Sequence, residues 1–253
     1  MKPQLDDWDR HWGDYAESAA MNPAQAYRRR LILRLLASDG DRPMRILDIG
    51  SGPGDLAADV HNAFPSAELL GLDVSEAAVE YAAHKVPTAT FVQRDLIRDA
   101  DADPEHRGWA THAVCSEVLE HVEDPGVLLA NARPYLAPGC RLVVTVPGGP
   151  MSEFDRHIGH RHHFTPQSLR AVVEEAGFEV ERAEGAGFPF FNLYRLTVLL
   201  RGKRLVDDVA QGAGSPSARA VMKVFDKLFR LNVASSPWGW QVLAAARFPG
   251  PTS

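Results

Sequence analysis

The chain has 253 residues, enough for one large domain with a substantial core or for a domain with a cap. Its net charge of −6 argues against the basic field with which proteins bind nucleic-acid phosphates, so we expect no nucleic-acid partner. The first residues lack the apolar core of a signal peptide, and no apolar run reaches the ~20 residues of a membrane span. We therefore expect a cytoplasmic protein.

Residues 1–40 are predicted to form an N-terminal helical cap. A polar and aromatic stretch with Trp8 and Trp12 comes first, and apolar residues recur with helical spacing after Pro23. Proline is favoured in the first turn of a helix because it has no N–H to leave unpaired there. The cap therefore ends in one helix that begins near Pro23.

A buried strand followed by a glycine loop comes next. Residues 45–49 are mostly apolar, and Gly50, Gly52 and Gly54 follow directly. Glycines accept positive φ and carry no Cβ, so a ligand can lie against the backbone. A helix is predicted from Leu56, and its free N–H groups would point at that ligand. The unit is typical of a site for a nucleotide-like molecule, although a tight turn without a ligand fits the loop alone equally well.

The glycine spacing discriminates between two classes of cofactor. A dinucleotide fingerprint places glycines at the first, third and sixth positions, and here the sixth position is Asp55. A nicotinamide-dependent oxidoreductase is therefore the disfavoured alternative. A cofactor-binding interaction protein that has lost catalysis is a second alternative.

The next strand, residues 67–73, ends in Asp73, roughly 20 residues beyond the loop, where a ribose would lie. An ionised carboxylate accepts hydrogen bonds at both oxygens, so Asp73 can hold both ribose hydroxyls. Val74 follows it, and Ser75 is a suitable cap for the next helix. Three further strands are predicted at residues 89–93, 110–115 and 141–147.

Two segments carry a family resemblance. The loop G-S-G-P-G, preceded by Asp48, resembles motif I of the class I S-adenosylmethionine-dependent methyltransferases. The string S-E-V-L-E-H-V-E-D-P at residues 116–125 resembles the segment after the fourth strand of ubiquinone-type and related type-11 methyltransferases. The resemblance implies an α/β, Rossmann-like, doubly wound sheet of seven strands, the last antiparallel, with helices on both faces.

The resemblance also implies S-adenosyl-L-methionine as the cofactor. In the family, an acid at the place of Asp95 contacts the adenine amino group. The residues expected to bind the cofactor are Asp48, Gly50, Ser51, Gly52, Gly54, Asp73, Val74, Asp95, Leu96, Ser116 and Glu117.

Residues 152–166 form a loop in which four of the ten histidines fall within seven residues. The loop resembles one that borders the acceptor pocket in type-11-like methyltransferases. Cysteine partners are absent and the spacing matches no metal motif, so we expect no metal site. A histidine can instead take the proton that a hydroxyl or amine acceptor loses.

Four residues are candidates for this chemistry. His160 or His157 is the expected base, with Asp155 orienting it. His121 is a rival, since it follows the fourth strand, although it could equally be a helix-start residue that packs on the sheet. Holding nucleophile, methyl group and sulfur in line would supply most of the acceleration.

The last two strands, near residues 177–182 and 241–246, are separated by a long insertion. We predict a core of residues 41–185 and 239–250 and a helical insertion of residues 186–238. Residues 195–230 hold eight basic and three acidic side chains, a net charge of +5. The insertion is a lid over an apolar acceptor, a homodimer surface or a peripheral membrane contact, and the lid is favoured.

The resulting hypothesis is methyl transfer from S-adenosylmethionine to oxygen or nitrogen of a small, apolar metabolite. The partner is a small-molecule acceptor.

Overall fold

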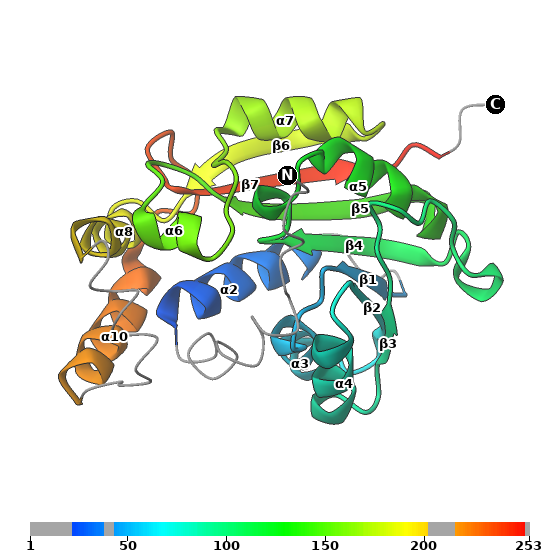
Figure 1. The fold of residues 1–253 in the computed structure, drawn as a ribbon, viewed down its shortest axis with the longest axis horizontal. Helices are drawn as coiled ribbons and strands as arrows, with labels where there is room; N and C mark the ends of the chain where they lie inside the picture. Colours follow the sequence, from blue (N-terminus) through cyan, green and yellow to red (C-terminus); the bar gives the residue numbers. More distant parts are fainter. Residues whose placement is uncertain (1–21, 38–42, 202–215, 251–253) are drawn as a thin grey trace, which may run out of the picture.

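The structure is a computed structural model that describes residues 22–37, 43–201 and 216–250 (Figure 1). Trp8, Trp12 and residues 202–215 of the insertion lie outside the described residues. The first described helix, α2, spans Pro23–Ala37 and begins at the proline that the sequence indicates.

Seven strands form one sheet in the order β3-β2-β1-β4-β5-β7-β6. Strands β1 to β5 pair in parallel, and β7 runs antiparallel to both β5 and β6. This confirms the predicted Rossmann-like doubly wound fold. The strands are β1 Arg45–Ile49, β2 Glu68–Asp73, β3 Thr90–Gln93, β4 Ala110–Ser116, β5 Leu136–Pro147, β6 Glu179–Ala186 and β7 Gln241–Arg247.

Strand β5 begins at Leu136, five residues before the predicted start at residue 141. Pro138 and Gly139, which would ordinarily favour a turn, instead lie inside the strand. Gly139 has φ of +76°, and the pairing of β4 with β5 shifts register between Ala110 and His112. A glycine that accepts this conformation lets the strand continue through the bulge.

Helices cover both faces of the sheet (Figure 1). The successive side chains of β1 show why: Leu47 and Ile49 join the core on one face, whereas Ile46 joins the core on the other. Helices α5 and α7 close the first core, and α2 and α3 close the second. The remaining helices are α3 Asp55–Ala63, α4 Glu76–Lys85, α5 Pro125–Ala132, α6 Glu153–His157, α7 Pro166–Glu175, α8 Phe190–Arg201 and α10 Pro216–Leu228.

The segment between β6 and β7 contains α8 and α10 and packs on α2 through aromatic rings. Tyr27 of α2 lies 5.6 Å from Phe191 and 5.5 Å from Phe229, measured between ring centroids. Tyr194 contacts Phe225 at 5.3 Å. The described part of the insertion is therefore fixed to the N-terminal helix by buried aromatic contacts.

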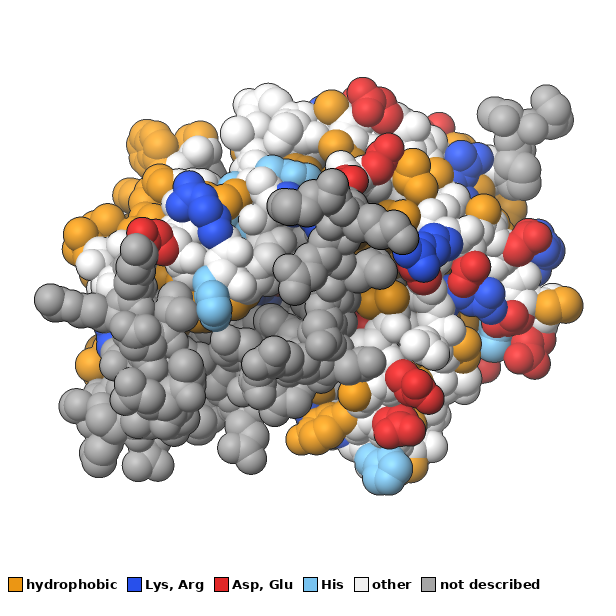
Figure 2. All heavy atoms as spheres, in the orientation of Figure 1, with side chains coloured by type: hydrophobic (Ala, Val, Ile, Leu, Met, Phe, Trp, Pro, Cys, Tyr) orange, Lys and Arg blue, Asp and Glu red, His pale blue; other side chains and the backbone are white. Residues whose placement is uncertain are grey.

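The outer surface of α8 carries apolar side chains. Leu193, Leu196 and Leu200 are 48%, 42% and 80% exposed. Figure 2 shows hydrophobic side chains gathered at the end of the molecule where α8 lies. In the described ranges, every helix is too short or too polar to cross a membrane.

Candidate functional site

The glycine loop joins β1 to α3 at the carboxyl edge of the sheet. Gly50, Gly52 and Gly54 have φ of +71°, +52° and +77°, so all three adopt the left-handed conformation that glycine favours. A Cβ at Gly50 would overlap the side chain of Val118. The loop is held down because the N–H groups of Gly50 and Ser51 donate to the Leu72 carbonyl oxygen at 2.8 and 3.0 Å.

Asp48 lies directly before this loop and is 2% exposed. Its Oδ2 has no hydrogen-bond partner among the described residues, and the same is true of the Ser51 hydroxyl. Burial, followed by the charge of Asp73, raises the Asp48 pKa to about 7. Buried polar atoms are normally paired, so these two atoms point to a polar group that the loop is built to receive.

Asp73 closes β2 and organises the neighbouring backbone. Its Oδ2 accepts the N–H of Gly52 at 2.8 Å, and its Oδ1 accepts the N–H of Ser75 at 2.9 Å. A carboxylate at this position suits a ligand hydroxyl, because its oxygens accept hydrogen bonds. Val74, next to it, is 43% exposed and offers an apolar surface at the same edge.

The third acid, Asp95, follows β3 and caps its own turn. Its Oδ1 accepts the N–H of Ile97 at 3.0 Å, and Oδ2 lies 3.4 Å from Nε of Arg98. Leu96 is buried beneath it. Asp95 therefore stands at the same edge as the glycine loop, with one oxygen oriented by the turn.

Glu117 follows β4 and is tied to two distant elements. Its Oε2 lies 3.1 Å from Nε of Arg28 in α2, and its Oε1 accepts a 3.0 Å hydrogen bond from Nε2 of Gln241 in β7. The Ser116 hydroxyl lies 2.9 Å from that of Thr145 in β5. Glu117 has φ of +57°, a backbone strain often found at functional sites.

A second group of polar side chains lies immediately after Glu117. Glu120 is fully buried, and neither carboxylate oxygen has a hydrogen-bond partner among the described residues. Burial, followed by the charge of Glu117, raises the Glu120 pKa well above its ordinary value. Nε2 of His160 lies 3.9 Å from Glu120 Oε1, and the rings of His121 and His160 meet edge to face at 4.7 Å.

Asp155 lies behind these histidines and is 1% exposed. Arg195 of α8 donates to both of its oxygens, at 2.9 and 2.7 Å, and Ser152 donates its N–H and hydroxyl, each at 2.7 Å. Burial alone would raise the Asp155 pKa, but these hydrogen bonds and the Arg195 charge hold it well below its usual range. The carboxylate is therefore fully engaged.

The structure brings His160 and His121 together but leaves His157 exposed near the end of α6. Asp155 Oδ1 lies 4.0 Å from His160 Nδ1, beyond hydrogen-bond range, whereas Nε2 of His163 lies 3.2 Å from that nitrogen. His163, rather than Asp155, orients His160. Burial and then the nearby His121 lower the His160 pKa to about 2, so its imidazole is neutral.

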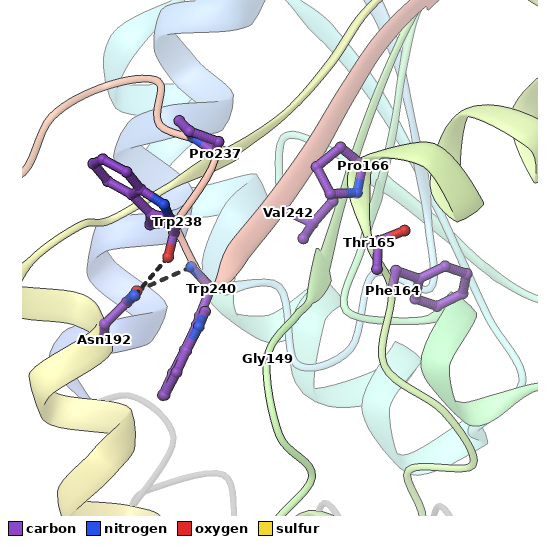
Figure 3. Close-up of a pocket in the computed structure, with 10 residues that line it drawn as sticks. Gly149, Phe164, Thr165, Pro166, Asn192, Pro237, Trp238, Trp240 and Val242 are labelled. Atoms are coloured by element: carbon purple, nitrogen blue, oxygen red, sulfur yellow. Dashed lines mark hydrogen bonds between the residues drawn. The ribbon is translucent and has the colours of Figure 1, made fainter.

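A pocket of about 420 Å³ opens beside the histidine loop (Figure 3). Trp238, Trp240 and Phe164 give it apolar walls, and Asn192 of α8 accepts from the Trp240 N–H and donates to the Trp238 carbonyl. Gly149 joins the pocket to the loop, because its carbonyl oxygen lies 3.0 Å from His163 Nδ1.

The family of methyltransferase domains matches residues 22–183, which is more than half of the chain. The chain belongs to the class I S-adenosylmethionine-dependent methyltransferases. This confirms the family resemblance drawn from the glycine loop and the segment after β4.

Among the relatives of this methyltransferase is an uncharacterized 37.1 kDa protein in transposon TN4556 of Streptomyces fradiae, 31% identical over 76% of this chain and 56% of its own length. The ubiquinone biosynthesis O-methyltransferase of Marinobacter nauticus is 28% identical over 60% of this chain and 71% of its own. The chain thus spans little more than half of the Streptomyces protein.

The N-methyltransferase NodS from Bradyrhizobium japonicum, solved with S-adenosyl-L-homocysteine, superposes with a TM-score of 0.55. The alignment covers 90% of this chain and 89% of NodS at 18% identity. At this identity the likeness establishes the shared fold.

The cofactor of the methyltransferase is S-adenosylmethionine, and the residues at the carboxyl edge fit it. The loop presents two polar atoms that have no hydrogen-bond partner among the described residues, Oδ2 of Asp48 and the Ser51 hydroxyl. Asp73 stands at the end of β2, where ribose hydroxyls would bind. These features would hold the amino-acid end and the ribose respectively.

Several residues of the candidate site could not be predicted from the sequence. Arg28 and Gln241 contact Glu117 from remote parts of the chain, so no local sequence pattern predicts these contacts. Arg195 did leave a signal, because a lone arginine inside the apolar stretch 188–200 needs a buried partner. Glu120 lay inside the matching segment, but only the structure shows that it faces His160.

Proposed function

We propose that the protein transfers a methyl group to oxygen or nitrogen of a small, apolar metabolite, and that the histidine cluster assists loss of the acceptor proton. When bound, S-adenosylmethionine supplies an electrophilic methyl group on a sulfonium. The chain's own residues hold the two reactants in line and exclude water, from which most of the acceleration would come.

One observation carries the proposal: the segment that follows β4 contributes residues both to the edge where the cofactor would bind and to the histidine cluster. Ser116 and Glu117 stand at the edge where the cofactor residues meet, and Glu120 and His121 follow them within a single short turn. His160 packs against that turn at 4.7 Å. The histidines that would receive the acceptor proton therefore lie close to the residues expected to bind the methyl donor.

The lowered pKa of His160 limits how it can act. An imidazole with a pKa of about 2 stays neutral, so it is a weak base towards a free hydroxyl. It can still accept a hydrogen bond from the acceptor, whose proton becomes strongly acidic as the methyl group arrives. His121 packs against His160 and could act beside it. His157 is exposed and Asp155 is fully hydrogen-bonded, so we assign these two residues supporting roles.

The insertion supports an apolar acceptor. Helix α8 contributes Asn192 to the pocket of Figure 3 and Arg195 to Asp155 of the histidine loop. Indole rings of Trp238 and Trp240 line the same pocket. We propose that residues 186–238 act as a lid over the acceptor, because their described parts line this pocket and contact the histidine loop.

Calorimetric titration with S-adenosylhomocysteine, with NADH in parallel, tests the cofactor half. Micromolar binding of the thioether, equivalent to about −8 kcal/mol, is expected, with no heat from NADH. A panel of apolar phenols, alcohols and amines with labelled cofactor then tests the transfer. Binding of NADH alone would assign an oxidoreductase, and binding without turnover of any acceptor would favour an interaction protein.

His160→Ala tests the acceptor half. Turnover should fall at least tenfold while affinity for S-adenosylhomocysteine is retained, since the neighbours of His160 are Glu120, His121 and His163. His84→Ala, on the exposed face of α4, is the matched control. Unchanged turnover of the His160 variant would remove this side chain from the reaction.

A further inference from the structure

A chain of hydrogen bonds settles which nitrogen of His160 carries its proton. The Gly149 carbonyl can only accept, so the Nδ1 of His163 that lies 3.0 Å from it carries hydrogen. A neutral imidazole carries hydrogen on only one ring nitrogen, so Nε2 of His163 is left with a lone pair. That lone pair accepts the Nδ1–H of His160 at 3.2 Å, and Nε2 of His160 is left unprotonated.

Two electron-rich groups consequently face each other in the interior. Nε2 of His160 points its lone pair towards Oε1 of Glu120, 3.9 Å away. Glu120 is fully buried, and both of its oxygens are without a hydrogen-bond partner among the described residues. The separation is too long for a hydrogen bond, even from a protonated carboxyl. It suits two ligands of one ion, since metal–nitrogen and metal–oxygen bonds are each about 2.0–2.2 Å.

His121 completes the set. One donor atom from each of Glu120, His121 and His160 lies within 4.8 Å of the others. Glu120 and His121 are neighbours in the short helical turn Leu119–His121, so a single backbone segment presents both. Hydrogen bonds from a ligating histidine to a carbonyl or another side chain commonly fix its tautomer, as His163 and Gly149 do for His160.

We propose that Glu120, His121 and His160 bind a divalent transition-metal ion. Two imidazoles and one carboxylate suit zinc, iron or manganese rather than calcium or magnesium, which prefer oxygen ligands. Three protein ligands leave a coordination position open, which an acceptor oxygen or water would take. That last role rests on the proposed methyl transfer, whereas metal binding itself does not.

A neighbouring group of Asp155, His160 and His163 has similar spacing but fits less well. Asp155 already receives four hydrogen bonds from Arg195 and Ser152. A cation there would also stand beside the Arg195 guanidinium. The site we propose therefore lies on the Glu120 side of His160, contrary to the expectation of no metal drawn from histidine spacing.

The test is calorimetric titration of the EDTA-treated, dialysed full chain with zinc chloride or manganese chloride. We expect one ion per chain for the wild type. Glu120→Gln, which keeps the shape and removes the charge, and His160→Ala should each weaken binding at least 100-fold. His163→Ala should weaken it 10- to 100-fold, since it removes the orienting hydrogen bond. His84→Ala is the control and should bind as the wild type does.

Visible absorption of the cobalt-substituted protein gives a second readout, because imidazole ligation changes the ligand-field bands. Retained affinity for S-adenosylhomocysteine shows that each variant is folded. Absence of metal binding by the wild type, or equal binding by Glu120→Gln, would overturn the proposal and leave a protonated Glu120 in its place. Metal binding without any binding of S-adenosylhomocysteine would instead contradict the proposed function alone.

Discussion

At the scale of single residues, the ion pair of Asp155 and Arg195 holds the histidine loop against the insertion. Both side chains are at least nine-tenths buried, and the pair is bidentate. A buried ion pair adds little net stability compared with apolar residues of similar size. Loss of one partner, however, is strongly destabilising, because the other charge stays buried without a counter-charge. The contact therefore fixes where α6 lies relative to α8.

Arg195→Met should lower the free energy of unfolding by about 3 kcal/mol, because Asp155 loses its counter-charge while remaining buried. Urea denaturation followed by circular dichroism measures this change. Adding Asp155→Asn should recover part of the loss, since the stranded charge is then removed. Arg182→Met, at an exposed position in β6, should stay within about 0.5 kcal/mol of the wild type.

The residues of the cofactor half were predictable because they follow strands at fixed spacing. Gly50, Gly52 and Asp73 were placed by local pattern alone, and their backbone geometry agrees. The acceptor half depends on contacts between remote segments. That His163 orients His160, and that Arg195 saturates Asp155, follows from tertiary packing that spacing does not encode.

At the scale of elements, the outer face of the insertion combines apolar and basic side chains. Leu196 and Leu200 of α8 and Val221 and Val224 of α10 are exposed. Lys223 and Lys227 are exposed on α10 as well. Apolar side chains flanked by positive charge are typical of peripheral contact with anionic lipid. We propose that this face, outside the lid's inner wall, docks on such a membrane.

Co-sedimentation with vesicles tests the contact. Binding is expected to vesicles that contain phosphatidylglycerol and not to pure phosphatidylcholine, and Lys223→Glu with Lys227→Glu should reduce it at least tenfold, at about 1 kcal/mol for each lost charge. Arg107→Glu with Arg182→Glu changes the net charge equally elsewhere and should bind as the wild type does. Absence of vesicle binding together with a dimeric mass in light scattering would assign the face to a homodimer.

Helix and strand order could be predicted because each element repeats its apolar residues at its own period. The segment between β6 and β7 was harder, since α8 is apolar on most sides and its buried and exposed faces look alike in sequence. Tyr27, Phe191 and Phe229 decide which face is buried, and they come from three separate elements.

At the scale of the whole molecule, buried acids give stability a definite dependence on pH. The pKa of Asp48 is raised from 3.8 to about 7, so above pH 4 the unfolded chain releases a proton that the folded chain keeps. Stability therefore falls as pH rises towards 7. The Asp155 contribution has the opposite sign, since its pKa is lowered, and it is lost only as pH falls below that window.

The free energy of unfolding should decrease between pH 4 and pH 7 by up to about 4 kcal/mol from Asp48 alone. Asp48→Asn should remove this part of the slope and should be more stable, relative to the wild type, at pH 7 than at pH 5. Urea titrations at several pH values measure both quantities. An identical slope in the variant would show that Asp48 ionises normally in the folded chain.

The register of β6 and β7 has a consequence for how this fold diversifies. Ala186 and Gln241, where the chain leaves and re-enters the sheet, are direct partners across an antiparallel pair. The residues between them thus begin and end at nearly the same point. Lengthening such an insertion raises the entropic cost of loop closure only slightly. If the insertion covers the acceptor as proposed, exchanging residues 186–238 for another segment would change the acceptor preference and leave the cofactor-binding residues in place.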